Sequence, residues 1–532
     1  MPSSMRQRAT YVVFGLLATV VGMAAGHLVA ALLNPASSPV LAVGSTVIDL
    51  TPTSLKEWAI AQFGDKDKAI LIGSVLLGVL VFAAIAGLLT RKRFAVGAGM
   101  LVFLVAVAGT AAMLRPSAEL IDLIPSIFTA IVAVAALWWL DRTAKAPAPA
   151  SDPHPMAEQT PARGSDENDT ARPVQEKAAP TRRGVLIAMG VLTAAAAVMG
   201  GAGRFIGNVR SRIEDIKFPT AAEPATALPQ GLDDQVPGIT NFRIANDDFY
   251  RVDTRLDKPI VDKEGWTLVI DGDVENELEF TFDELLEMPL IERDITLTCV
   301  SNSVGGEFVG GARWIGVRLT DLLDMAGVGG TADQILSTDF DGMTISTPLD
   351  LATDGRDAMI ALGMNGEALP RAHGFPARMV IPGLYGFISA TKWVTRLTLT
   401  TYADQESYWT EREWATDAPI KISTRIDTPK ALAQLDRGEN IVGGVAWAQQ
   451  KGGVAKVEVR VDGGAWEEAT LGPDGGNDYW RQWFYKWDAD EEGQHSVAAR
   501  VTSGDGEVQS AARANPFPEG SSGIQELLVT VA

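Results

Sequence analysis

The chain has 532 residues and a formal net charge of −21, and it contains a single cysteine. One thiol excludes an intramolecular disulfide scaffold and an iron–sulfur cluster held by this chain alone, because both need several cysteines. Most of the acidic residues follow residue 204, and a surface of that sign repels phosphates, so we expect no nucleic-acid partner.

Five apolar segments lie in the first 204 residues. Each of the first four is close to the ~20 residues that cross a bilayer core, and together they predict a four-helix transmembrane region over residues 1–140. The fifth is richer in Ala and Gly and predicts one more membrane helix over 184–204. The five segments are Tyr11–Leu33, Ala69–Thr90, Phe94–Leu114, Leu123–Leu140 and Gly184–Gly203.

Basic residues flank these segments at four places, which are Arg6 and Arg8, Arg91 to Arg93, Arg142 and Lys145, and Arg182 and Arg183. All four clusters fall on one side if the N-terminus is cytoplasmic, and Lys and Arg favour that side. We therefore predict a multi-pass protein in the lipid bilayer of the plasma membrane, with everything after about residue 204 outside the cytoplasm. Residues 141–183, rich in Pro, Ala and charge, predict a disordered cytoplasmic linker.

The stretch "TRRGVLIAMG" at residues 181–190 has two interpretations. Two arginines before a weakly apolar run resemble a twin-arginine export signal, here internal, and that route carries folded proteins. The other interpretation is an ordinary basic flank on the cytoplasmic side of a membrane helix. Both stay open on the sequence alone.

The membrane segments offer little for a redox cofactor. A bis-histidine haem needs two histidines within the membrane, and His27 is the only one in these segments. The chain has no C-x-x-C-H sequence, no G-x-G-x-x-G after a strand and no Walker loop. We therefore expect neither haem nor nucleotide in this chain, and we interpret the membrane region as an anchor or docking platform.

The part outside the membrane predicts two domains. In residues 205–424, short strands such as "ITLTCV" mix with helices such as "ARWIGVRLTDLLDMAGV" without regular βαβ alternation, which favours an α+β domain. From 425 to 532 the pattern becomes all-β. "KVEVRVDGGAWEEATL" places Val457, Val459 and Val461 on one face and then turns, and evenly spaced hairpins of this kind indicate an immunoglobulin-like sandwich.

The single cysteine, Cys299, ends the apolar run "ITLTCV". Such a cysteine is most often a small buried hydrophobe. A nucleophilic thiol would need a base, and only His373 and His495 are available in this half of the chain. A metal thiolate would need more ligands, and no zinc-type set of Cys and His exists. A metal whose other ligands come from an organic cofactor is the remaining alternative.

A second cluster lies in "MNGEALPRAHGFPARMVIPGLYGFISATKW", residues 364–393. It gathers Arg371, His373, Arg378 and Lys392 among glycines and prolines. Rigid turns present backbone N–H groups, and basic side chains beside them suit a phosphate or another anion. The alternative is a solvated basic face on a loop-rich surface.

Four motifs occur in order: "ITLTCVSN", "ARWIGVRLTDLL", the 364–393 stretch and "GVAWAQQKGGVAKVEVRVDGGAWEEATL". Together they resemble the sulfite oxidase family of molybdenum–molybdopterin enzymes over roughly residues 240–532. The resemblance implies a molybdenum–molybdopterin cofactor in the α+β domain, a small-molecule substrate and an external electron carrier. It also implies that the C-terminal domain forms a homodimer.

The same resemblance assigns roles to residues. Cys299 would be the protein thiolate on molybdenum, for which a soft ligand is apt. The implied cofactor contacts are Asp247, Tyr250 and Arg251 in "DDFYR", Asn302, Thr338 in "LSTDF", His373 and Arg378 in an H-G-x-P-x-R pattern, and Ser389, Thr391 and Lys392 at the pterin phosphate.

The chain also departs from the family pattern. Sulfite-oxidising members carry arginines shortly after the cysteine, where Ser303 and Val304 stand here, and a tyrosine near the position of Gly363. Arg251 or Arg313 could compensate as a catalytic residue. We expect oxygen-atom transfer on a small substrate, possible in either direction. The alternatives are an S- or N-oxide reductase, for example of methionine sulfoxide, and a non-catalytic envelope scaffold.

Overall fold

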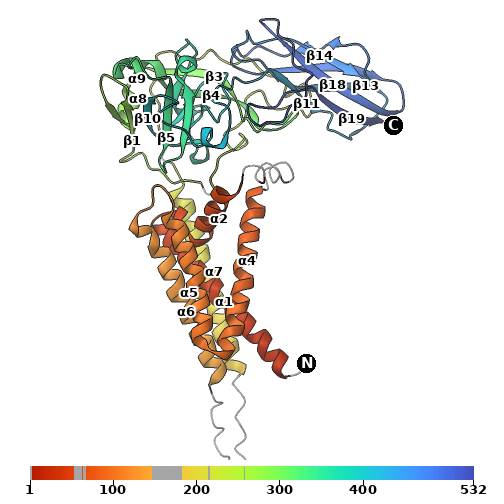
Figure 1. The fold of residues 1–532 in the computed structure, drawn as a ribbon. Coiled ribbons are helices and arrows are strands. Elements are labelled where there is room, and N and C mark those ends of the chain that lie inside the picture. The colour runs from red at the N-terminus through yellow and green to blue at the C-terminus, as the bar shows by residue number, and fades with distance from the viewer. Residues whose placement is uncertain are drawn as a thin grey trace, which may run out of the picture. The chain divides into compact units, whose positions relative to one another are not determined.

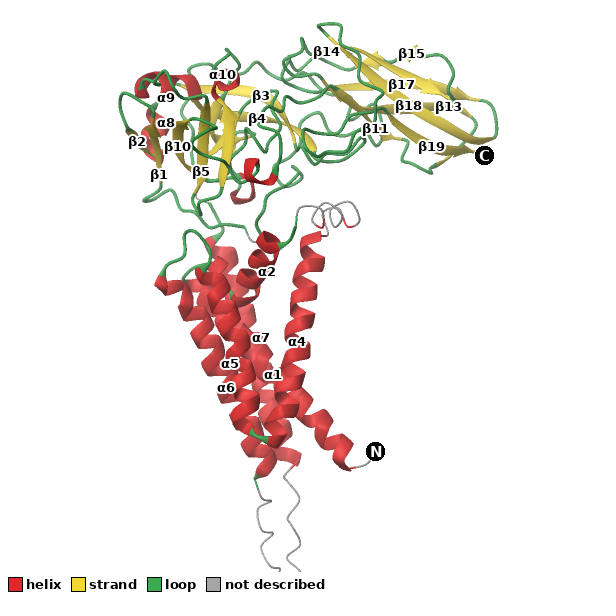
Figure 2. Cartoon of the chain, in the orientation of Figure 1, coloured by secondary structure: helices red, strands yellow, loops and turns green. Residues whose placement is uncertain are grey.

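The computed structural model describes residues 3–52, 55, 63, 67–146, 182–213, 216–256 and 258–532. Most of the predicted cytoplasmic linker, residues 147–181, lies outside the described residues. The chain divides into a helical unit that ends at Arg210 and a β-rich unit that begins at Ser211, and a short segment around Arg255 belongs to the helical unit. Figure 1 follows the chain through both units, and Figure 2 separates helices from strands.

The helical unit contains the five predicted membrane helices. Each is long and apolar enough to cross a membrane, as predicted. A shorter apolar helix, α2, begins with a proline at its first turn and was missed, because its twelve residues are too few to span a bilayer. The helices are α1 (Ser3–Leu32), α2 (Pro39–Leu50), α4 (Asp67–Lys92), α5 (Phe94–Met113), α6 (Ile124–Lys145) and α7 (Arg182–Arg210).

Glycines let the helices of this unit approach closely. On α1, a Cβ at Gly15 would meet the carbonyl oxygen of Ala83 on α4, and a Cβ at Gly87 would meet that of Tyr11. Helices in membranes pack tightly at such small residues because lipid provides no hydrophobic drive for association. The Tyr11 hydroxyl also donates to Asp141 on α6 at 2.9 Å.

The first part of the β-rich unit holds two sheets and short helices. One sheet has the order β2-β1-β10-β5-β6, with β1 and β10 parallel, and the other has the order β3-β4-β7-β8, with β9 on β7. The strands are β1 (Thr267–Gly272), β2 (Leu278–Thr281), β3 (Leu290–Thr298), β4 (Val309–Arg318), β5 (Gln334–Asp339), β6 (Thr344–Pro348), β7 (Met359–Met364), β8 (Glu367–Ala368), β9 (Arg378–Val380) and β10 (Val394–Thr400). The helices are α8 (Phe282–Glu287), α9 (Leu319–Ala326), α10 (Leu349–Ala352) and the 3-10 turns η4 (Arg371–His373) and η5 (Thr410–Arg412).

Helix α9 follows its sequence pattern. It buries the predicted apolar face, made of Leu319, Leu322, Leu323 and Ala326, and it ends at Gly327, whose φ of 69° is left-handed. Glycine takes that conformation without a steric cost, which is why it commonly ends helices. The predicted mixture of strands and short helices is confirmed for this part of the chain.

The last part of the unit consists of two sheets, with the orders β11-β13-β17-β16 and β12-β19-β18-β14-β15. As the alternation predicts, Val457 and Val459 of β14 are fully buried, and Val461 packs against the same core. The immunoglobulin likeness stays a prediction. The strands are β11 (Ser423–Thr428), β12 (Gln434–Leu435), β13 (Gly438–Trp447), β14 (Val454–Val461), β15 (Glu467–Glu468), β16 (Thr470–Leu471), β17 (Arg481–Ala489), β18 (Gly493–Ser503) and β19 (Gln525–Val531).

The two parts of the β-rich unit share a hydrophobic core. Trp447 ends β13, and Tyr479 and Trp480 lie in the loop before β17, yet all three belong to the same buried cluster as Leu268 of β1. The Tyr479 hydroxyl and the Trp480 indole nitrogen both donate to the carbonyl oxygen of Phe242, at 2.7 and 2.8 Å. Buried aromatic residues contribute much of a core's stability, so the two parts pack against each other across the predicted boundary near residue 425, while the C-terminal sheets also enclose a core of their own.

Candidate active site

Cys299 follows the last residue of β3 and begins a tight turn. Its backbone N–H donates to the carbonyl oxygen of Phe308 at 2.9 Å, and its sulfur accepts from the N–H of Ser301 at 3.4 Å. Asn302 closes the turn, since its N–H donates to the Cys299 carbonyl and its side chain accepts from the Phe308 N–H. The cysteine is 9% exposed, and burial raises the pKa of its thiol. A thiolate at this position therefore needs a cation to stabilise it.

Neither histidine of the β-rich unit serves as a base for this thiol. His373 is buried and its Nε2 lies 3.0 Å from the carbonyl oxygen of Asn246, and His495 pairs with Asp462 at 2.6 Å. Burial, together with nearby cations, lowers the pKa of His373 to about 3. Within the described residues neither ring hydrogen-bonds to Cys299, so the geometry does not favour a thiol–imidazole nucleophile.

Arg378 on β9 is a buried cation that has no acidic partner. Its guanidinium donates to the carbonyl oxygens of His373 at 3.2 Å and Met379 at 3.4 Å, and it stacks 5.0 Å from the ring centre of Trp314. Burial lowers its pKa to about 10. No carboxylate forms an ion pair with it in the described part of the chain. Because a buried unpaired charge is costly, this side chain suits an anionic ligand.

A second group of charges lies close by. Arg251 and Lys392 both donate to the same carboxylate oxygen of Asp253, each at 2.7 Å. Burial lowers the pKa of Lys392 to about 8 in spite of that carboxylate. Lys392 is close enough for its charge to favour the thiolate form of Cys299, which acts against the rise in the thiol pKa that burial causes.

The structure places Ser337, the neighbour of the predicted cofactor contact Thr338, against the loop that contains Ser389 and Thr391. Ser389 and Thr391 are buried as a cofactor-contacting loop requires, and Ser389 donates to the carbonyl oxygen of Tyr385 at 3.0 Å. The Thr391 hydroxyl lies 2.6 Å from that of Ser337, one residue before the predicted contact Thr338. Neighbouring residues of a strand face opposite sides, so Ser337 is the residue of β5 that reaches this loop. The motif "LSTDF" alone did not distinguish the two.

The segment "DDFYR" brings some predicted residues to the pocket and not others. Asp247 is exposed, whereas the preceding residue, Asn246, supplies the carbonyl that contacts His373. Tyr250 is partly buried, and its ring stacks on Phe249 at 5.1 Å. Burial and the nearby Cys299 thiolate raise the pKa of the Tyr250 phenol. No residue pattern points to Asn246, because it contacts His373 through its backbone carbonyl.

Arg313, predicted as a catalytic candidate, forms an ion pair with Asp294 instead. Its guanidinium donates to both carboxylate oxygens of Asp294, at 3.0 and 2.5 Å. The register of β3 and β4 places it opposite Asp294, whereas Val309 lies opposite Thr298, the residue before the cysteine. The structure therefore does not bring Arg313 together with Cys299.

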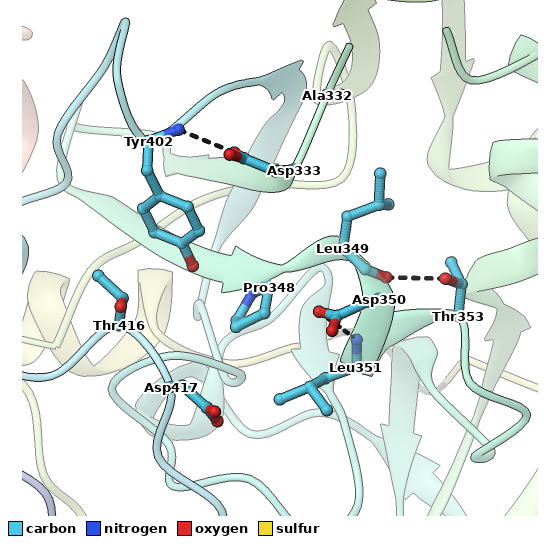
Figure 3. A pocket seen from close by; sticks show the side chains of 10 residues that line it. All are labelled: Ala332, Asp333, Pro348, Leu349, Asp350, Leu351, Thr353, Tyr402, Thr416 and Asp417. Carbon is cyan, nitrogen blue, oxygen red and sulfur yellow. Dashed lines mark hydrogen bonds between the residues drawn. The ribbon is translucent and has the colours of Figure 1, made fainter. Parts of the chain in front are cut away.

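A separate cavity of about 580 Å³ lies near the start of β5 and the end of β6. Figure 3 shows its lining, in which the backbone N–H of Tyr402 donates to Asp333 at 2.8 Å. Three aspartates and no basic residue line it, and none of the predicted site residues does. The lining consists of Ala332, Asp333, Pro348, Leu349, Asp350, Leu351, Thr353, Tyr402, Thr416 and Asp417.

Residues 255–409 match the family model of the oxidoreductase molybdopterin binding domain. The chain is 31% identical to mitochondrial sulfite oxidase of Mus musculus over 36% of its own length and 43% of that protein, and 29% identical to an NADH nitrate reductase of Nicotiana tabacum over 41% and 30%. The sulfane dehydrogenase SoxCD of Paracoccus pantotrophus is a solved structure with 23% identity and a TM-score of 0.49, covering 55% of this chain and 82% of that one.

The chain spans about half the length of the sulfite oxidases that it matches. These matches place a region similar to the molybdopterin-binding domain of oxidoreductases at residues 255–409, and the proteins that the chain resembles are sulfite oxidases and nitrate reductases. Over part of its length the chain is similar to the sulfite oxidases, and over residues 255–409 it matches the molybdopterin-binding domain.

The donor set fits this cofactor. The described residues contain no cluster of three or more His, Cys, Asp or Glu that could hold a metal ion, so a metal on Cys299 needs its other ligands from outside the chain. Molybdopterin supplies sulfur ligands and a phosphate, and a phosphate suits the guanidinium of Arg378, which forms no ion pair within the described residues.

Proposed function

We propose that this chain is a membrane-anchored molybdenum oxidoreductase that transfers an oxygen atom to or from a small, sulfur-containing substrate. When bound, the cofactor supplies two-electron oxygen-atom transfer. The observation that carries the proposal is a buried thiol, Cys299, within the electrostatic reach of Lys392, in a domain that matches the molybdopterin family. Oxygen-atom transfer adds or removes two electrons at the enzyme in each turnover, so we also propose that an external carrier exchanges electrons with it.

In this proposal each residue of the pocket has a chemical task. Cys299 ligates the metal. Arg378 and Lys392 hold anionic groups of the cofactor, with Arg251, Ser389, Thr391 and Asn302 supporting their loops. His373 stays neutral because its pKa is about 3, and contact of its Nε2 with a carbonyl oxygen implies that Nε2 carries the proton. Its Nδ1 is then a hydrogen-bond acceptor for an N–H group of the pterin.

We also propose that the β-rich unit faces the outside of the cytoplasm and that its C-terminal sheets form a homodimer. The support for the orientation is the placement of basic residues. Arg91 and Lys92 end α4, Arg142 and Lys145 lie in the last turn of α6, and Arg182 begins α7. These ends share one side if five helices span the bilayer, and that side is cytoplasmic by the distribution of positive charge.

Elemental mass spectrometry tests the proposed function. The wild-type chain and Cys299→Ser would be expressed in a host that makes molybdopterin. We expect near one molybdenum per wild-type chain, and a serine variant that keeps the pterin but loses redox activity. If the wild type contains neither molybdenum nor pterin fluorescence, a non-catalytic scaffold is the correct interpretation.

One observation favours an S- or N-oxide reductase as a second candidate. Both arginines that could replace the missing arginine of the sulfite-oxidising pattern are already paired. Arg313 pairs with Asp294, and Arg251 pairs with Asp253 at 2.7 Å. A dianion such as sulfite needs unpaired cations, whereas a neutral sulfoxide does not.

Steady-state assays of the loaded enzyme separate the two reactions. We expect faster reduction of free or peptide-bound methionine sulfoxide than oxidation of sulfite. Saturable sulfite oxidation at micromolar substrate, without sulfoxide turnover, would rule out the reductase.

A further inference from the structure

The connection between β18 and β19, residues 504–524, is longer than the ~12–15 residues at which loops without regular structure become uncommon and are often functional. Residues 516–525, which are the last part of this connection and the first residue of β19, are called the C-terminal strap below. The strap makes contacts beyond the C-terminal sheets that it connects. It contacts two parts of the candidate active site, the Cys299 turn and Tyr385.

The strap is bound directly to the Cys299 turn. The Ser521 hydroxyl donates to the carbonyl oxygen of Asn302 at 2.5 Å. The Asn302 N–H in turn donates to the carbonyl of Cys299 at 3.0 Å. At Gly305 a Cβ would lie 2.7 Å from the side-chain nitrogen of Gln525, which leaves no space between strap and turn. Asn302 therefore links the strap through hydrogen bonds to the backbone of Cys299, the only cysteine of the chain.

The strap is also in close contact with the side chain of Tyr385. A Cβ at Gly520 would lie 2.5 Å from the Tyr385 hydroxyl oxygen, and the φ of Gly520 is 94°. Lys421 holds the strap there, since its ammonium donates to the Gly520 carbonyl at 2.9 Å and to Glu519 at 3.1 Å. The Lys421 backbone N–H contacts the Tyr385 hydroxyl at 3.4 Å. Tyr385 is buried, and its phenol is close enough for the charge of Cys299 to affect it.

We propose that the C-terminal strap is a positioning element of the active site, which keeps the Cys299 turn closed and controls access to the thiol side of the pocket. The hydrogen bond from Ser521 and the steric contact of Gly520 supply this control. Their consequence for substrate entry rests on the proposed function. The closure itself is a property of this chain without cofactor.

The single cysteine makes the proposal testable in the cofactor-free, full-length protein. Alkylation by iodoacetamide reports only Cys299, and its rate follows the opening of the segments that cover it. Ser521→Ala removes one hydrogen bond to the turn, so we expect alkylation to accelerate roughly five-fold. Ser522→Ala is the matched control, because that hydroxyl donates to Ala512 at 2.7 Å, away from the turn, and its rate should equal wild type.

Gly520→Ala should also accelerate alkylation, since it forces the strap off Tyr385. Gly506→Ala is its control, because Gly506 has a φ of 87° in the same connection but no neighbour within 4 Å of a Cβ. Equal alkylation rates for Ser521→Ala, Gly520→Ala and both controls overturn the proposal. If the strap variants do not fold, hydrogen exchange of the wild type decides, because residues 299–308 and 516–525 must then open together. If the backbone amides of the strap exchange far faster than those of the Cys299 turn, the proposal is contradicted.

The molybdenum-loaded enzyme gives an independent readout. Ser521→Ala should keep the wild-type molybdenum content and change KM more than kcat, because the strap governs entry and not the chemistry. A wild type without molybdenum refutes the proposed function while the alkylation rates still decide on the strap.

Discussion

Arg378 and Lys392 face each other across an antiparallel β-bridge. This pairing brings together the buried Arg378 and the partly buried Lys392, and within the described residues only Lys392 has a carboxylate partner. The backbone of the loop that connects them also contains Ser389 and Thr391. The bridge therefore gathers the predicted anion-binding residues at one place before any ligand arrives.

The absence of an acid beside Arg378, within the described residues, predicts opposite effects on stability and on loading. Arg378→Met should leave the unfolding free energy of the cofactor-free protein unchanged or raise it by ~1–4 kcal/mol, since it removes a buried unpaired charge. It should abolish most of the molybdenum content. Thermal unfolding and elemental analysis measure the two effects.

Arg313→Met is the matched comparison. It leaves the carboxylate of Asp294 buried, with Arg243 at 3.9 Å as its remaining partner, and should destabilise the protein by up to about 3 kcal/mol. Its molybdenum content per folded chain should equal that of wild type. If Arg313→Met loses the metal and Arg378→Met keeps it, the assignment of the two arginines is reversed.

The buried His373 predicts a loss of stability in acid. Its pKa is about 3 in the folded state, against about 6.5 in the unfolded chain. The unfolded state binds more protons between these values, so stability falls as the pH drops from about 6.5 towards 3, by roughly 4 kcal/mol at the lower end. His373→Gln should remove this part of the pH dependence, as urea unfolding at several pH values would measure.

His495 predicts a pH dependence of stability that has the opposite sign. Its bond with Asp462 raises its pKa in the folded state, so its contribution to stability is complete below about pH 6.5 and is lost as the pH rises through the folded-state value. His495→Gln should therefore destabilise the protein more at low pH than at high pH. Identical pH profiles for the two variants would contradict both assignments.

Gly374 links backbone conformation to the anion site. Its φ is 113°, and a Cβ would lie 3.0 Å from the Cβ of Arg378 and 3.1 Å from the Cα of Lys392. Gly374→Ala should cost about 1–3 kcal/mol of stability and also lower molybdenum content. Gly355→Ala has a similar φ, 103°, with no neighbour within 4 Å, so it should lose stability but keep the metal. Equal metal loss in both variants would mean that the contact is unimportant.

The close approach of α1 and α4 predicts a packing-sensitive position in the membrane region. Gly87→Leu has no room beside the carbonyl of Tyr11, whereas Gly78→Leu on the same helix meets nothing within 4 Å. Thermal unfolding in detergent should show a lower midpoint for Gly87→Leu and a midpoint near wild type for Gly78→Leu. A similar midpoint for both would indicate that the two helices separate freely.

Periodic and local features of this chain were predictable from sequence. The long apolar segments, the buried face of α9 and the alternation along β14 each follow from one residue pattern that the element repeats. α2 was missed because it is short and begins at a proline soon after another helix.

Features set by partners distant in the sequence were not predictable. Nothing in "LSTDF" indicates that Ser337 and not Thr338 reaches Thr391, because register depends on the neighbouring strands. Likewise Arg313 resembles a free cation until β3 places Asp294 opposite it. The contact of Gly520 with Tyr385 joins residues that no local pattern connects.

The shared core has a consequence for how the protein is made. Trp480 and Tyr479 complete the packing around Phe242 and β1, and they are synthesised after the whole of residues 205–424. A ribosome that has released residues 205–424 has thus not yet delivered these two aromatic residues. The core around Phe242 can therefore be completed only after residue 480 has left the ribosome.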